Sequence, residues 1–156
     1  MATREYRAMI ERERTEIGPL GRTAPAARAP DAEARATILV VEDDASIAEL
    51  LVELLESVGY RAFHTNNGRN ALTIARAIHP ELVLTDYLMP EVNGKQIIHT
   101  LRASPATHDI PAVLMSSTRP REAALRDVPF LPKPFNLEDV LTIVERHIAE
   151  PLPPIE

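Results

Sequence analysis

Residues 38–44 read ILVVEDD, in which four aliphatic side chains are followed directly by three acidic ones. A continuous aliphatic run rich in Ile and Val is typical of a strand in a parallel sheet that is covered on both faces. The acids mark the end of that strand and the approach of a helix. Further strands are expected over residues 61–65, 82–85, 112–115 and 130–131.

The segments between these strands carry apolar residues at helical spacing. This spacing predicts helices over residues 47–58, 72–78, 96–102 and 137–148. Between Pro120 and Pro129 only residues 121–126 can form a helix, so the fourth of five helices should be short. Strands and helices that alternate in this way predict the α/β class, with a doubly wound five-stranded parallel sheet and helices on both faces.

Composition limits the number of domains. The chain has 156 residues, of which 45% are hydrophobic, enough for one packed domain and a tail. We assign the domain to residues 37–150. Residues 1–36 read as an N-terminal extension, in which an Arg/Glu-rich stretch over 1–17 can form a short helix before a Pro/Ala linker, and residues 151–156 read as a C-terminal tail.

Charge and cysteine content exclude several classes of function. The net charge is −6, and residues 37–156 carry ten cationic side chains against seventeen acidic ones. An acidic surface disfavours sequence-independent binding to nucleic acid. The lack of cysteine excludes disulfides and thiolate metal sites. No apolar run approaches the roughly 20 residues that span a bilayer, and no secretion signal is present, so we expect a cytoplasmic protein.

Polar side chains stand where the predicted strands end. Glu42 and Asp43 follow the first strand, Asp86 the third, Ser116 the fourth and Lys133 the fifth. The carboxyl ends of parallel strands meet at one edge of a doubly wound sheet, where ligands bind. We therefore expect these side chains to converge in one crevice.

The three acids at residues 42–44 have two interpretations. Acids before a helix complement its dipole and cap its first turn, but one residue suffices for a cap. Adding Asp86 to the same crevice makes the carboxylates repel one another unless a cation compensates them, which favours Mg²⁺. A carboxylate beside such an ion is a competent phosphoryl acceptor, and Lys133 can supply a second positive contact.

Four motifs in order resemble a two-component response-regulator receiver domain of the CheY-like type. They are ILVVEDD at 38–44, DYLMPEVNG at 86–94, PAVLMS at 111–116 and LPKPF at 131–135. The resemblance covers residues 37 to about 150 and implies the sheet order 2-1-3-4-5. It also implies that Asp86 is the phosphoacceptor, that Lys133 is the family's lysine, and that Ser116 and Phe130 are the switch hydroxyl and switch aromatic residue.

The resemblance extends to metal, partners and mechanism. Glu42, Asp43, Asp86 and the backbone carbonyl of Leu88 are the implied ligands of Mg²⁺, which Mn²⁺ can replace. A histidine kinase or histidine phosphotransferase would donate the phosphoryl group, and an unknown downstream protein would receive the signal, with homodimerisation left open. The chain would thus be a stand-alone switch and no enzyme beyond its own phosphorylation and dephosphorylation.

Departures from the family pattern add further expectations. Glu42 replaces the more frequent Asp of the acidic pair, and the short segment between Ser116 and Lys133 removes most of the fourth helix. Leu88 and Thr118 occupy positions that influence attacking water, and the apolar Leu88 predicts slow loss of phosphate. The resemblance itself, and not a departure from it, implies a cis bond from Lys133 to Pro134.

Alternative interpretations concern both the histidines and the function. The five histidines show no paired metal-ligand spacing, and we expect them at the surface or in helices. An interaction domain that keeps this fold without being phosphorylated is one alternative function. A haloacid-dehalogenase-like phosphohydrolase is another, but its nucleophile follows the first strand and has a second Asp two residues on, whereas Asp86 follows the third.

Overall fold

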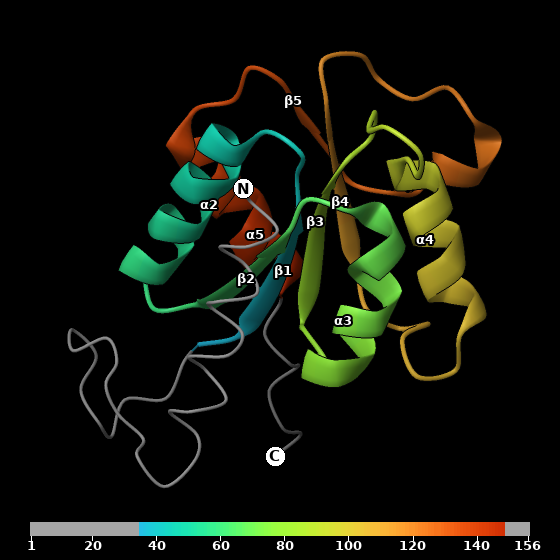
Figure 1. Ribbon diagram of the computed structural model, residues 1–156. Helices are drawn as coiled ribbons and strands as arrows, with labels where there is room; N and C mark the ends of the chain where they lie inside the picture. The colour runs from blue at the N-terminus through green and yellow to red at the C-terminus, as the bar shows by residue number, and fades with distance from the viewer. Residues whose placement is uncertain (1–34, 149–156) are drawn as a thin grey trace, which may run out of the picture.

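Figure 1 shows the computed structural model, which describes residues 35–148. The helix expected over residues 1–17, the linker that follows it and the tail at 151–156 lie outside the described residues. Within residues 35–148, no helix is long and apolar enough to cross a membrane. Arg35 already belongs to the folded part, because its backbone N–H donates to the Gly59 carbonyl at 2.9 Å.

The core of the fold is one five-stranded parallel sheet in the order β2-β1-β3-β4-β5. The strands are β1 (Thr37–Val41), β2 (Arg61–Thr65), β3 (Leu82–Asp86), β4 (Ala112–Ser116) and β5 (Phe130–Pro132). Each lies within one or two residues of its predicted position. The doubly wound fold predicted from the alternation of strands and helices is confirmed.

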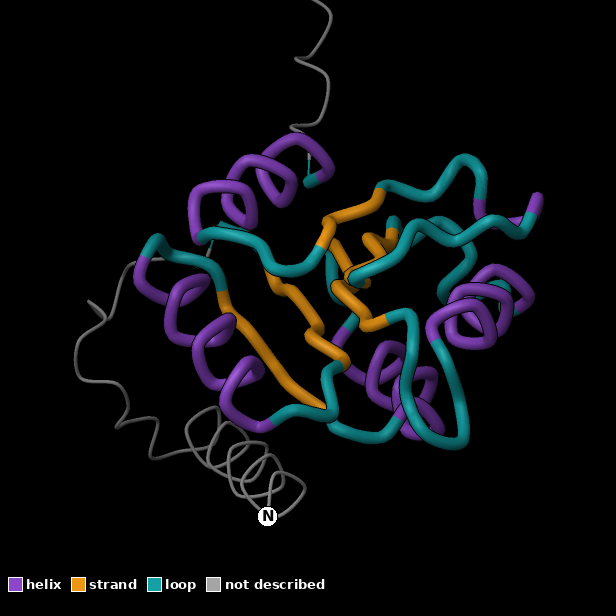
Figure 2. Tube along the Cα trace, turned by 90° about the horizontal axis from the view of Figure 1, so that it is seen from above, coloured by secondary structure: helices purple, strands orange, loops and turns teal. Residues whose placement is uncertain are grey.

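Four α-helices cover the two faces of the sheet within the described range. They are α2 (Ala45–Ser57), α3 (Ala71–Ile78), α4 (Gly94–Ala103) and α5 (Leu137–His147). In Figure 1, α2 and α5 lie on one side of the sheet and α3 and α4 on the other, and the view from above in Figure 2 shows the sheet between these layers. Ile38 and Val40 pack on the α2/α5 side, whereas Leu39 and Val41 pack on the α3/α4 side. Burial of alternate residues on both faces explains why the first strand is aliphatic throughout.

No α-helix forms between β4 and β5. A single 3-10 turn, Ala123–Leu125, stands where the short fourth helix was expected. Leu125 and Val128 from this segment are buried against Ile98 of α4 and Leu114 of β4. Two apolar side chains therefore replace a full helix as the cover for this end of the sheet.

The prediction for the histidines was wrong at His64. This residue lies in β2 and is 7% exposed. Its ring nitrogen Nε2 lies 2.8 Å from the backbone carbonyl oxygen of Glu42 and must donate to it, because a carbonyl only accepts. His64 therefore helps to place the main chain at the end of β1.

Candidate functional site

The acids at residues 42–44 divide their roles. Asp44 is the N-cap of α2, and its Oδ1 accepts hydrogen bonds from the backbone N–H groups of Ser46 at 2.9 Å and Ile47 at 3.1 Å. Glu42 lies one residue beyond β1 and is only 1% exposed, whereas Asp43 is exposed. The helix-cap interpretation therefore holds for Asp44, whereas Glu42 and Asp43 are available to bind a cation in the crevice.

Glu42 is held in place by its main chain. Its backbone N–H donates to the carbonyl of Thr65 at 3.1 Å, and its own carbonyl accepts from His64. Its carboxylate oxygen Oε2 accepts from the backbone N–H of Asp44 at 3.1 Å. These contacts from β2 and from the start of α2 fix a buried acid at the edge of the sheet.

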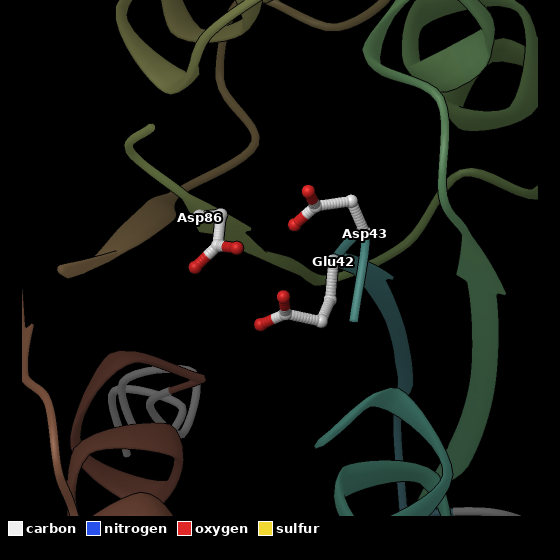
Figure 3. A group of neighbouring side chains, drawn as sticks. All are labelled: Glu42, Asp43 and Asp86. Carbon is white, nitrogen blue, oxygen red and sulfur yellow. The ribbon is translucent and has the colours of Figure 1, made fainter. Parts of the chain in front are cut away.

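Asp86 ends β3 beside these acids. It is 4% exposed, and its strand is buried along its whole length. Glu42, Asp43 and Asp86 each offer a carboxylate oxygen, and the three oxygens lie within 4.8 Å of one another. Figure 3 shows the three carboxylates turned toward a common space. The predicted convergence of β1 and β3 at one crevice is therefore present in the structure.

Lys133 brings a cation to the same place. Its Nζ lies 2.6 Å from Asp86 Oδ1 and 3.3 Å from Glu42 Oε1. Burial alone would lower the pKa of this lysine, but the hydrogen bond to Asp86 and the negative charges of Asp86 and Glu42 raise it above its usual value. Lys133 is therefore positively charged at neutral pH, and its Nζ lies between the side chains of Asp86 and Glu42.

The buried acids bind protons more tightly than free ones. Burial, with a hydrogen bond to Asp86 and the charge of Asp86, raises the pKa of Glu42 to about 8. Burial also raises the pKa of Asp86, against the opposing effect of hydrogen bonds from Glu42 and Lys133. In the metal-free protein at pH 7, Glu42 is therefore mostly protonated, and Asp86 is the acid that pairs with Lys133.

This donor set suits a hard divalent cation. All three side chains offer carboxylate oxygens, which Mg²⁺ prefers, and one member of the set is exposed, so water can complete the coordination. A cation would also offset the charge of Asp86, which adds to burial in raising the pKa of Glu42. The contribution of the Leu88 backbone carbonyl stays a prediction; the residue itself is 65% exposed.

Ser116 and Phe130 lie on the strands beyond Asp86. Ser116 ends β4, is buried, and accepts a hydrogen bond from the Thr118 backbone N–H at 3.1 Å. In the sheet register Asp86 pairs with Met115, so Ser116 is one residue further along the neighbouring strand. Phe130 begins β5, and its half-buried ring carries the Arg119 guanidinium carbon 4.9 Å from its centroid. The switch roles of both residues stay predictions.

Two contacts near the site were not found from the sequence. The Tyr87 hydroxyl donates to Glu122 Oε2 at 2.5 Å, which links the residue after Asp86 to the segment between β4 and β5. This hydrogen bond raises the pKa of Tyr87 and lowers that of Glu122. Tyr87 and Glu122 are 35 positions apart, and no periodic pattern in the sequence links residues at that distance. Only the expectation that both lie beside β4 could have suggested this contact. The peptide bond from Lys133 to Pro134 is cis, as expected.

Comparisons with known proteins agree with this geometry. The model of the response regulator receiver domain family matches residues 38–145. The DNA-binding transcriptional regulator NtrC of Rhizobium meliloti is 34% identical over 121 residues, which are 74% of this chain and 25% of that protein. The chain thus spans about a quarter of that relative's length.

Solved structures show the same fold. Chemotaxis protein CheY4 of Vibrio cholerae has a TM-score of 0.68 at 26% identity, over 74% of this chain and 99% of that one. The receiver domain of sensor histidine kinase PA1611 from Pseudomonas aeruginosa PAO1 has a TM-score of 0.66 at 23% identity, over 72% of this chain and 97% of that one. That structure has a magnesium ion coordinated in its active site cleft. At this identity the similarity is one of fold alone. On the family match and the site at the ends of β1, β3 and β5, the chain belongs to the response regulator receiver domains of two-component signalling.

Proposed function

We propose that this chain is a phosphoacceptor switch in a two-component phosphorelay and that Asp86 accepts the phosphoryl group. The observation that carries the proposal is the 2.6 Å contact between Asp86 Oδ1 and Lys133 Nζ inside a cluster of three carboxylates. A buried nucleophilic carboxylate, a fixed ammonium and an oxygen donor set at one strand edge are the groups that phosphoryl transfer requires.

The phosphodonor in this proposal is a phosphohistidine of a histidine kinase or a histidine phosphotransferase. The second oxygen of the Asp86 carboxylate attacks phosphorus in line, the bond between phosphorus and the imidazole nitrogen breaks, and the bonding electrons stay on that nitrogen. Lys133 stays beside the attacking group and balances negative charge on the phosphoryl oxygens. The product is an acyl phosphate on Asp86.

Glu42, Asp43 and Asp86 would hold Mg²⁺ together with the Leu88 carbonyl, and Mn²⁺ would use the same oxygens. The bound ion supplies positive charge to the transferring phosphoryl oxygens. Glu42 must lose its proton to serve as a ligand, since its pKa is about 8 without the metal. His64 keeps Glu42 in position through the carbonyl contact at 2.8 Å.

The signal in this proposal is a change of packing at β4 and β5. Ser116 exchanges its bond from the Thr118 N–H for one to the phosphoryl group, and the Phe130 ring turns inward into the space released. The ring now lies half-buried under Arg119, so the inward state must break that contact. Phosphorylation shifts the population between two arrangements of one surface.

Receiver domains act with histidine kinases and downstream proteins, and the partners of this chain belong to the proposal. We propose that residues 37–150 are the switch and residues 1–36 and 151–156 its extension and tail, and that it turns over no external substrate. Cytoplasmic location and slow loss of phosphate past the exposed Leu88 stay predictions, as does homodimerisation. A phosphate lifetime of seconds would contradict the expectation for Leu88.

The test is labelling by acetyl phosphate with Mg²⁺, followed by the mass of the intact protein. We expect one added phosphoryl group on the wild type and on the control Asp109→Asn, which changes an exposed acid far from β3 in the sequence. Asp86→Asn and EDTA should each abolish the label. Loss of labelling in the wild type, under conditions that label another receiver domain, would favour an interaction domain that is never phosphorylated.

A further inference from the structure

The segment that joins β4 to β5 is drawn in orange in Figure 1. A small cavity lies beneath it, on the side of the sheet that carries α4. Its volume is about 140 Å³. Leu114, Leu125, Val128 and Phe130 provide its apolar walls. A cavity of about this size takes up a benzene-sized group, so it has room for one apolar side chain. The segment above it contains a single 3-10 turn, Ala123–Leu125, and no α-helix.

The rim of the cavity is cationic. Arg119, Arg121 and Arg126 line it and are exposed, and they are three of the ten cationic residues in the acidic region 37–156. Within residues 35–148, none of the three forms an ion pair with a carboxylate. Unpaired arginines around an apolar hollow attract carboxylates and can bind them through two parallel hydrogen bonds.

The only acidic side chain of the rim already has a partner. Glu122 Oε2 accepts from the Tyr87 hydroxyl, and the pKa of Glu122 is lowered, so its carboxylate is ionised and held toward Tyr87. Among the described residues, Glu122 forms no ion pair with the three arginines. Arg119 packs over the Phe130 ring, so Arg121 and Arg126 are the two arginines left for a ligand. The same hydrogen bond connects the cavity to the residue that follows Asp86.

We propose that this cavity docks a peptide segment of a partner protein in which one Leu- or Phe-like residue is flanked by Asp or Glu. The apolar residue enters the space between Leu125 and Phe130, and the acidic neighbours pair with Arg121 and Arg126. A second copy of the chain is a weaker candidate for two reasons. Two chains that each have a net charge of −6 repel one another. The second copy must also present an exposed apolar residue next to its acidic residues. Leu50 on α2, 44% exposed and next to Glu49, and Leu137 at the start of α5, 41% exposed and followed by Glu138 and Asp139, are the described residues that come nearest to this pattern.

The test uses a random-peptide display library as the probe, selected on the full chain that has met no phosphodonor. We expect the selected peptides to be enriched in acidic residues around a single Leu or Phe. Binding of one selected, fluorescein-labelled peptide is then measured by anisotropy. The selection does not depend on the chemistry of Asp86. If Asp86 is not phosphorylated, the peptide result still holds, and if no such peptide is selected, the phosphorylation result still holds.

The variants separate local charge from total charge. Arg121→Glu/Arg126→Glu should weaken peptide binding by about tenfold or more, because attraction becomes repulsion. The control Arg69→Glu/Arg146→Glu has the same net charge, changes exposed arginines elsewhere, and should stay within about twofold. Binding by wild type should also weaken as salt is raised. All four substituted positions are exposed, and Arg69 loses only an exposed ion pair with Glu91, so we expect the variants to fold, which circular dichroism checks.

Four results would overturn the proposal. One is a selection without the acidic and apolar pattern, and another is equal loss of binding in both double variants. A further one is self-association in sedimentation velocity that the peptide abolishes and that Leu50→Glu or Leu137→Glu also abolishes, since the occupant would then be a second copy. The last is tighter peptide binding after deletion of residues 149–156, which contain Glu150 and Leu152, since the chain would then fill its own cavity.

Discussion

Glu42 offers the sharpest quantitative prediction, because binding of Mg²⁺ must expel its proton. With a pKa of about 8 in the metal-free protein, only about a tenth of the Glu42 carboxyls are ionised at pH 7. A raised carboxyl pKa means that the proton competes with the metal below pH 8. The apparent affinity for Mg²⁺ should therefore rise with pH, by about tenfold from pH 6 to pH 7 and by roughly fivefold from pH 7 to pH 8.

Isothermal titration calorimetry tests this directly. Titrations at pH 7 in two buffers that differ in ionisation enthalpy should give the release of about 0.9 proton per Mg²⁺. Glu42→Gln keeps the shape of the side chain but has no proton to lose, so it should bind Mg²⁺ more weakly with little pH slope. Glu49→Gln, an exposed position on α2, is the matched control and should behave as wild type.

A flat dissociation constant between pH 6 and pH 8 would refute this reasoning. So would the release of less than about a fifth of a proton at pH 7. Either result would mean that Glu42 is ionised before the metal arrives, and that burial next to Asp86 does not govern its protonation.

Three further predictions test how the site is built. Asp44→Ala should lower the free energy of unfolding in urea by about 1 kcal/mol through loss of the α2 cap. The affinity of this variant for Mg²⁺ should hardly change. Asp43→Asn should do the opposite and weaken Mg²⁺ binding with little loss of stability. Gly94→Ala should cost about 1–3 kcal/mol in the same assay, because its new Cβ would lie 2.5 Å from a backbone oxygen at the end of β3, and an unchanged midpoint would show that the loop yields freely. Tyr87→Phe should release Glu122 and loosen the segment between β4 and β5, seen as faster amide hydrogen exchange there than in wild type, while exchange in α2 stays the same.

The sheet, and the meeting of Glu42, Asp86 and Lys133 at one edge of it, could be predicted because two simple rules apply to them. Aliphatic runs such as Leu39–Val41 identify strands buried on both faces, and the carboxyl ends of parallel strands meet at one edge. These rules placed Asp86 and Lys133 together, although they are 47 positions apart in the chain, and the structure confirms the contact at 2.6 Å.

The rest depends on packing that no spacing reveals. His64 looked like a surface histidine, but its place in β2 next to β1 turns it into a buried donor to the Glu42 carbonyl. The raised pKa of Glu42 follows from burial and from the nearness of Asp86, neither of which the motif contains. The cavity beneath the β4–β5 segment likewise depends on how Leu125 packs against the sheet, which the sequence does not reveal.

The most direct test of the central claim is to trap the acyl phosphate and locate it in the sequence. After treatment with acetyl phosphate and Mg²⁺, reduction with borohydride converts an aspartyl phosphate to homoserine, and peptide mass spectrometry reads the modified position. The account predicts homoserine at residue 86 alone, and none in the EDTA-treated sample. Homoserine at another acid, such as Asp43, or no homoserine beside a phosphorylated control receiver, would contradict the assignment of Asp86 as the phosphoacceptor.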